Sequence, residues 1–202
     1  MKLNHLLLLT SLSISAYAAP QSFDFKDPKG VNNAIFKLDA PLESINGSAS
    51  GITGTVSFDP ENPAATTGKI VVASESLTVP NPMQKEHLHG ANWLEVAKYP
   101  EITFEAKSLA NVKTDGNVTT ADATGTFTLH GVSKELTVPI KLTYLKDKLS
   151  ARVPNLKGDL LVVRANFTIN REDFNIQKGQ YEDKVSPTID LSLAIAGASI
   201  AQ

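Results

Sequence analysis

Two histidines separated by one residue, His87 and His89, are the side chains of this sequence best suited to metal chemistry. Neutral imidazole is the commonest protein ligand for metal ions. The segment around them is expected to be helical, and residues two apart in a helix do not share a face. Further ligands would have to come from the adjacent Glu86 or the distant His130, which falls short of a tetrahedral zinc set. We therefore assign no metal.

Arg171 and Asp173 form a second candidate pair, at the end of a predicted strand. The two side chains are two residues apart, which suits a local ion pair. A guanidinium also matches the planar geometry of a phosphate group, so Arg171 could instead contact an anionic ligand. Both interpretations stay open at this point, and the sequence favours the ion pair.

Motifs of catalysis are absent from the sequence. It has no cysteine, no Gly-x-Ser-x-Gly nucleophile turn and no glycine-rich phosphate loop. Acidic residues are plentiful, but none pairs with another inside an apolar run, where burial would shift the pKa of a catalytic carboxyl. The sequence therefore predicts a protein that is not an enzyme and carries no cofactor. A hydrolytic site without a motif stays an open alternative, because fold does not fix function.

Composition narrows the range of partners. The 202 residues carry 19 basic and 21 acidic side chains without a basic cluster, which argues against nucleic acid and against a polybasic membrane-surface patch. Aromatic residues make up 6% of the chain, too few for a carbohydrate-stacking surface. Without cysteine, neither a disulfide nor a lipid-modified cysteine can form, so the domain must be stable through its core alone.

Most of the chain alternates between apolar and polar residues, which is typical of strands with one wet face. The clearest run extends from Leu136 to Tyr144, where five alternate positions are apolar. Pro139 lies on the opposite face of this run and indicates a bulge or an edge position. Turn residues such as His130-Gly131 separate the runs. The predicted strands are residues 34–38, 53–58, 68–77, 102–109, 124–129, 136–144, 160–169 and 189–195, with a further alternating run at Phe23 and Phe25.

A single helix is expected in this β-rich chain, over residues 87–96. Leu88, Trp93 and Leu94 would form its apolar face, and Pro100 stops it because the residue before a proline leaves the helical region. A lone helix in such a chain usually covers a barrel mouth or a sheet face. Eight or more short strands with one helix and no βαβ rhythm predict an all-β antiparallel barrel or sandwich.

Three spaced segments resemble the YceI-like polyisoprenoid-binding family of exported bacterial proteins. They are His87-Leu88 through Trp93-Leu94 to Tyr99-Pro100-x-Ile102-x-Phe104, then residues 125–134 (GTFTLHGVSK), then residues 170–176 (NREDFNI). Asp27-Pro28 and residues 54–59 also fit in place and order. Several motifs in register over nearly the whole chain are far more specific than any one of them.

The resemblance implies an all-β, lipocalin-like, up-and-down antiparallel barrel of about eight strands, with one short helix near the mouth. It also implies that the barrel holds a long apolar chain, so that the protein carries or sequesters a polyisoprenoid or a similar amphiphilic lipid. An eight-stranded barrel is just wide enough for side chains alone or for one slender ligand. The residues predicted to contact this ligand are Phe36, Phe58, Leu88, Trp93, Phe104, Phe127, Phe167 and Arg171.

Each of these residues also has a plainer interpretation. The phenylalanines could fill an ordinary core, and Trp93 could anchor the helix instead of plugging the barrel end. Two other functions therefore stay open: a solid-barrel structural or interaction protein of the cell envelope, and an enzyme acting on a lipid held in the cavity. A hollow apolar interior would favour the carrier, and a filled core would favour the interaction protein. A polar cluster at the cavity floor, with His130 or Arg171 beside carboxylates, would favour the enzyme. Whether two barrels associate as a homodimer is also open.

The chain departs from the family pattern at three places. Asn32-Asn33 stand where the family usually carries a histidine-serine pair, Lys85 where it usually has aspartate, and Asn175 where it usually has glycine. Asparagine tolerates a left-handed turn better than most residues, so the change at Asn175 is mild. The other two departures bear on any polar contact with the head group of a ligand.

Residues 1–18 have the pattern of a secretory signal peptide. Lys2 precedes an apolar run from Leu6 to Ile14, and Ala16-Tyr17-Ala18 matches a small-x-small cleavage site. The lipid-binding domain is therefore expected to span residues 19–202, and the protein is expected to be periplasmic or secreted. No later stretch approaches the length needed to span a bilayer.

Cleavage after Ala18 predicts the amino terminus of the exported protein. Amino-terminal sequencing of protein recovered from outside the cytoplasm should begin at Ala19-Pro20. Exported protein that still begins at Met1 would contradict the signal-peptide interpretation.

Overall fold

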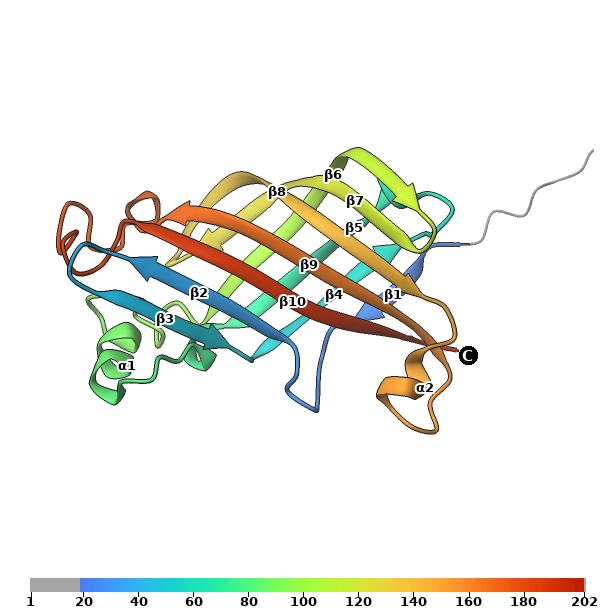
Figure 1. The fold of residues 1–202 in the computed structure, drawn as a ribbon, viewed down its shortest axis with the longest axis horizontal. Coiled ribbons are helices and arrows are strands. Elements are labelled where there is room, and N and C mark those ends of the chain that lie inside the picture. The colour runs from blue at the N-terminus through green and yellow to red at the C-terminus, as the bar shows by residue number, and fades with distance from the viewer. Residues whose placement is uncertain (1–18, 202) are drawn as a thin grey trace, which may run out of the picture.

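The computed structural model describes residues 19–201, and the predicted signal segment 1–18 lies outside the described residues. The chain forms an antiparallel β-barrel with a short helix near each end (Figure 1). Within this described part, no helix is both long and apolar enough to cross a membrane. The strands are β1 (Gln21–Asp24), β2 (Asn33–Asp39), β3 (Ser44–Ala49), β4 (Ile52–Phe58), β5 (Thr67–Ala73), β6 (Glu101–Asp115), β7 (Val118–Leu129), β8 (Val132–Leu145), β9 (Gly158–Asn170) and β10 (Thr188–Ile200). The helices are α1 (Pro82–His89) and α2 (Leu149–Arg152), with single 3₁₀ turns η1 (Pro63–Ala65), η2 (Ser74–Ser76) and η3 (Arg171–Phe174).

Eight strands close the barrel. β4 to β10 follow one another as an up-and-down meander, and β1 completes the ring by pairing with both β4 and β10. The β2–β3 hairpin pairs with the first half of β10, and β1 meets β10 further along, at Ala198. The predicted antiparallel barrel of about eight strands is confirmed. Strand β3 was not predicted, because Ile45 is its only large apolar residue and gives no alternation.

Alternation directs one set of side chains into the barrel. In β8, Val138 and Leu142 are buried while Pro139 and Lys141 face solvent, as predicted for this run. β8 pairs with β7 from Val132 onward, but with β9 only over residues 140–145. Pro139 therefore lies immediately before the β8–β9 ladder begins at Ile140, and the predicted edge position is confirmed.

The helix at the barrel mouth begins earlier than the sequence predicted. α1 spans Pro82–His89 and not residues 87–96. Asn81 starts it, because its side-chain oxygen accepts the N–H groups of Met83 and Gln84 at 3.0 and 3.2 Å, and a proline fits the first turn, where its missing donor costs nothing. The chain after Gly90 continues in turns. Trp93, Leu94 and Val96 thus pack against the apolar cluster from turns, and their spacing resembles that of a helical face.

The loop between β1 and β2 is fixed by a buried carboxylate. Asp27 Oδ2 accepts the N–H groups of Val31 and Asn32, both at 2.7 Å, and lies 2.9 Å from a guanidinium nitrogen of Arg152 in α2. Burial alone would raise the pKa of Asp27, but the backbone donors and Arg152 outweigh it and hold that pKa below its ordinary value. The family departure at Asn32 therefore belongs to this packing beside α2.

Replacing Asp27 by asparagine is expected to lower the unfolding free energy by about 1.5–3 kcal/mol at neutral pH, because charge-assisted hydrogen bonds are lost. The folded-state pKa of Asp27 is depressed, so its contribution is present above the unfolded carboxyl pKa and is lost as the pH falls through the folded one. Urea unfolding should show that the difference in unfolding free energy between wild type and Asp27→Asn decreases as the pH falls. Asp24→Asn, at an exposed carboxylate, is the control. A gap that does not change with pH would contradict this role.

Candidate functional site

The interior of the barrel is hollow. A cavity of about 840 Å³ runs between the inward faces of the strands and reaches α1. This volume lies within the range of roughly 300–1,000 Å³ that is usual for small-molecule sites. Its wall is largely aliphatic and aromatic, with Phe36, Val72, Phe104, Phe127, Phe167 and Ile169 among the lining residues.

Small residues at inward positions keep the middle of the barrel open. Ala34, Gly68, Ala106, Ala123 and Ala165 all line the cavity, and they come from five different strands. Larger side chains at these positions would meet across an eight-stranded barrel and fill it. The hollow is therefore a direct consequence of which residues alternate inward.

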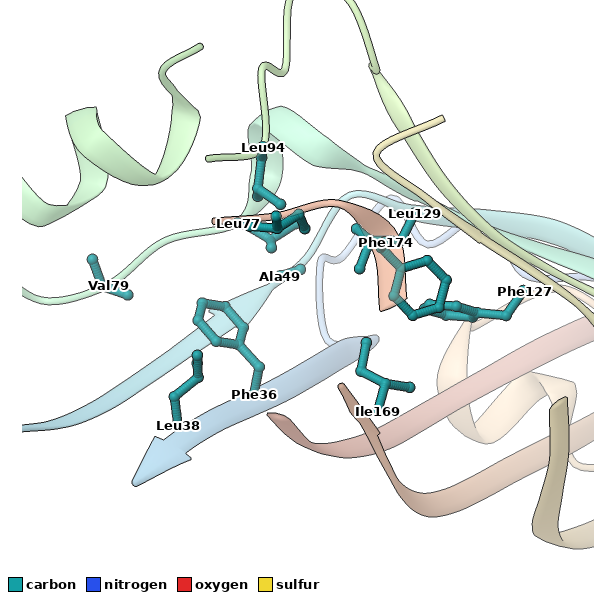
Figure 2. Packing of buried hydrophobic residues seen from close by; sticks show 11 residues of the cluster. Phe36, Leu38, Ala49, Leu77, Val79, Leu94, Phe127, Leu129, Ile169 and Phe174 are labelled. Atoms are coloured by element: carbon teal, nitrogen blue, oxygen red, sulfur yellow. The ribbon is translucent and has the colours of Figure 1, made fainter. Parts of the chain in front are cut away.

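Aromatic side chains build the cavity wall toward the mouth, as Figure 2 shows for Phe36 and Phe127. The Phe127 ring lies edge-on to Phe174 and to Phe167, with ring centroids 5.5 and 6.2 Å apart. The Phe36 ring lies over Gly47 of β3, where an added Cβ would come within 2.1 Å of it. Gly47 thus lets Phe36 lie close against the neighbouring strand.

Two turns and α1 frame the mouth of the cavity. The turn that follows α1, residues 90–99, meets the loop 175–187: Gln177 Nε2 donates to the carbonyl of Asn92 at 2.5 Å, and the rings of Trp93 and Tyr181 lie 6.0 Å apart. An amphiphile whose tail occupied the barrel would place its polar end at this rim. The polar side chains there include Glu43, Gln84, Glu86, His87 and Lys184.

Arg171 is the largest fully buried side chain among the described residues, and it organises the loop 175–187. Burial lowers the pKa of Arg171, whereas the nearby carboxylates of Glu172 and Glu182 raise it. An arginine stays protonated in proteins, so its donors must all find acceptors. The guanidinium donates to the carbonyl oxygens of Ile176, Gln177, Gln180, Val185 and Ser186.

The predicted ion pair between Arg171 and Asp173 is wrong. Asp173 lies on the surface, 3.3 Å from Lys134 Nζ, whereas Arg171 turns inward and takes part in none of the ion pairs of the described chain. Both residues lie in the 3₁₀ turn η3, after β9 has ended at Asn170, and side chains two residues apart in such a turn point in different directions. Arg171 lines the cavity, and its Cζ lies 6.0 Å from the centroid of the Trp93 ring. Contact of Arg171 with a ligand stays a prediction.

Seven of the eight residues predicted to contact a ligand line the cavity. They are Phe36, Phe104, Phe127 and Phe167 on the walls, and Leu88, Trp93 and Arg171 at the mouth. Phe58 is outside the lining and packs with Phe23 and Tyr144 near the other end of the barrel. Whether any of these side chains touches a ligand stays a prediction.

The histidines near the mouth do not converge on one point. His89 Nε2 lies 2.7 Å from the carbonyl oxygen of Leu77, and His130 Nδ1 lies 3.1 Å from that of Phe174. His130 and Gly131 form the predicted hairpin turn between β7 and β8, with φ values of 51° and 72°. Within residues 19–201, no group of three or more histidine, cysteine, aspartate or glutamate side chains is arranged to hold a metal.

The loop 175–187 contributes lining residues that the sequence did not reveal. Ile176, Tyr181 and Val185 all face the cavity, yet they show no periodic spacing. The loop starts at Asn175, whose φ of 58° is the left-handed conformation expected there. Asn170 at the end of β9, whose side-chain oxygen accepts the N–H of Glu172 at 2.9 Å, is a second local signal that a turn follows.

Sequence comparison finds a matching family model and similar proteins. Residues 29–196 match the family model of the YceI-like domain. Protein YceI of Escherichia coli O17:K52:H18 is 32% identical over 194 residues, which covers 95% of this chain and 94% of the relative. A UPF0312 protein of Yersinia pestis is 30% identical over 156 residues, which covers 77% of this chain and 74% of the relative.

Solved structures share the fold. BcnA of Burkholderia cenocepacia has a TM-score of 0.63 at 20% identity, covering 82% of this chain and 94% of BcnA. A polyisoprenoid binding domain from Saccharophagus degradans, implicated in plant cell wall breakdown, has a TM-score of 0.63 at 12% identity. The match covers 89% of this chain and 99% of that domain. At such identities the likeness establishes the barrel fold alone.

Proposed function

The chain belongs to the YceI-like family, and from that premise we propose that it is an exported carrier that sequesters a polyisoprenoid or a similar amphiphilic lipid. The apolar tail would lie in the barrel, and the polar end would stay at the rim beside α1. The observation that carries this proposal is the hollow, apolar interior. A neighbour in fold is a polyisoprenoid binding domain, which supports the same class of ligand.

Burial of the tail would supply most of the binding free energy. Ten methylene-sized groups at roughly 0.8 kcal/mol each would contribute about 8 kcal/mol before the costs of association are subtracted. If each carbon takes about 30 Å³, the share of a water molecule in the liquid, a cavity of about 840 Å³ holds on the order of 28 carbons. That is a tail of roughly five or six isoprene units by the same measure.

The interior also bears on the two competing functions. A solid-barrel interaction protein would fill its centre, whereas alanine or glycine occupies several inward positions in the middle of this barrel. An enzyme would need polar groups beside the tail. His130 Nε2 lies 4.0 Å from a carboxylate oxygen of Glu95, but neither residue lines the cavity, and the N–H groups of Arg171 are engaged by backbone carbonyls. Both observations support the carrier.

The carrier would act outside the cytoplasm. The signal-peptide pattern of residues 1–18 supports a location in the periplasm or beyond the cell. An isoprenoid tail has almost no solubility in an aqueous compartment, because apolar surface is costly to expose to water. A barrel that hides the tail would allow such a lipid to cross that compartment.

Trp93 provides a direct test, because it is the single tryptophan of the chain and lines the cavity mouth. Delipidated protein would be titrated with geranylgeraniol while Trp93 fluorescence is followed. We expect a saturable spectral shift at one ligand per barrel. Cholate, a rigid amphiphile, controls for non-specific partitioning and should not give it. A titration that stays linear, or that cholate reproduces, would contradict the proposed function.

A further inference from the structure

Three aromatic rings lie together at the end of the barrel opposite α1. Phe23 of β1, Phe58 of β4 and Tyr144 of β8 have ring centroids 5.8 to 6.4 Å apart. Phe23 is 0% exposed and Phe58 is 2% exposed. We call this set the aromatic floor. It draws on three strands that are distant in the sequence, so only the closed barrel assembles it.

Hydrogen bonds tie the aromatic floor to the end of the barrel. The Tyr144 hydroxyl donates to Asp159 Oδ2 at 2.6 Å, and Asp159 Oδ1 accepts the N–H of Asp147 at 2.7 Å. Burial, together with the hydrogen bond to Asp159, raises the pKa of Tyr144 to about 12, so the phenol stays neutral and keeps donating. Two edge-on ring contacts, one tilted contact and a fixed hydroxyl leave these rings little freedom to move aside.

The cavity stops at the aromatic floor. Val56, Leu142 and Val163 line the cavity and also belong to the apolar cluster that contains Phe23 and Phe58. The three rings do not line the cavity themselves. Val56 is paired with Phe23 across the β4–β1 ladder, so the last lining residues and the rings are immediate neighbours. A tail that enters beside α1 would therefore pass the wall residues and end against this layer.

We propose that the aromatic floor sets the longest tail that the barrel accepts, an inference that rests on the proposed function. The wall residues limit the width of a ligand, whereas the floor limits its depth. Close packing means that a tail gains nothing from carbons that find no space. The six-carbon ring of Phe58 is about the size of one five-carbon isoprene unit. Removing that ring should lengthen the preferred tail by about one unit, and adding a ring above it should shorten the tail by about one.

A competition experiment tests this directly. Delipidated wild type, Phe58→Ala and Val56→Phe would each be incubated with an equimolar ladder of all-trans prenols that differ by one isoprene unit. The bound prenols would be counted by native mass spectrometry. Phe58→Ala should raise the bound ratio of the next longer prenol to the wild-type favourite at least tenfold. Val56→Phe should shift the same ratio toward the next shorter prenol, and it decides the question alone if Phe58→Ala does not fold.

Phe167→Ala is the matched control, because it removes the same ring from the cavity wall and not from its end. It should widen the cavity and leave the preferred length unchanged. If wild type binds prenols of the ladder but neither Phe58→Ala nor Val56→Phe changes the preferred length, the inference is wrong and the proposed function stands. If Phe167→Ala shifts the length as far as Phe58→Ala does, depth is not set at the floor. If wild type binds no prenol at all, the proposed function itself fails.

Discussion

Replacing Arg171 by alanine is expected to lower the unfolding free energy by about 3–5 kcal/mol, the upper range for single substitutions. The change removes every donor that the carbonyls of residues 176–186 now share, and each buried carbonyl left without a partner costs about 1–3 kcal/mol before the loop relaxes. Urea unfolding followed by circular dichroism measures the loss. Arg164→Ala, at an exposed arginine on the outer face of β9, is the control and should change stability by less than about 0.5 kcal/mol.

The same variant separates two roles of Arg171 in binding. If the guanidinium acts by holding the loop 175–187 against the mouth, Arg171→Ala should weaken neutral prenols and prenyl phosphates by similar factors. Arg171→Lys keeps the charge but has three donors instead of five, so its effects should be intermediate. A selective loss of prenyl phosphate binding, with neutral prenols unaffected, would contradict the loop-holding role. It would instead support contact of Arg171 with an anionic head group, which the match between guanidinium and phosphate suggested.

Replacing Ala123 by phenylalanine is expected to reduce prenol affinity about 100-fold, which corresponds to about 2.7 kcal/mol of binding free energy. Ala123 is 2% exposed and lines the cavity midway along β7, so the new ring would occupy the space meant for the tail. Because that space is empty of protein atoms, the ring should cost less than the roughly 1–3 kcal/mol that overpacking a filled core costs. The prenol titration that uses Trp93 fluorescence measures the loss of affinity.

Thr120→Phe places the same side chain on the same strand but on its solvent face, and it should leave prenol affinity unchanged. Thermal unfolding of both variants would show that each is folded. Equal affinity of Ala123→Phe and wild type would mean that no tail passes Ala123, and the cavity could not be the binding site. A solid-barrel interaction protein would then be the better interpretation.

The strands that face the cavity were predictable because alternation is a local property. The run from Leu136 to Tyr144 shows its inside and outside faces in the sequence, and Pro139 marks the place where the β9 ladder begins. The position of α1 was also encoded locally, since Asn81-Pro82 is a strong helix start. The prediction followed the apolar spacing of residues 88–96 instead, but turns can produce that spacing as well as helices.

The role of Arg171 could not be predicted, because its partners are backbone carbonyls that every residue has. A charged residue near an opposite charge in the sequence looks like an ion pair, and nothing local shows that Arg171 turns inward while Asp173 stays on the surface. Phe58 was assigned to the tunnel for a similar reason. Alternation shows that its ring faces inward, but depth along the barrel depends on how β1, β4 and β8 come together.

The hollow interior was present in the sequence as a pattern of residue size. Inward positions such as Ala123 and Ala165 carry small side chains in the middle of their strands. Counting apolar residues treats alanine and phenylalanine alike, so the sequence alone favoured a filled core and left the empty barrel as an alternative. Which positions face one another across the barrel becomes known only from the strand register.

Native mass spectrometry of the protein purified gently from its own cell envelope tests the carrier function most directly. A carrier should appear as a complex with one additional mass per barrel, and organic extraction should release an isoprenoid or a similar long-chain amphiphile in roughly equal molar amount. The Ala123→Phe protein, prepared in parallel, should be largely free of that mass. Wild-type protein without any bound lipid, which also fails to take up added prenols after purification, would contradict the carrier function.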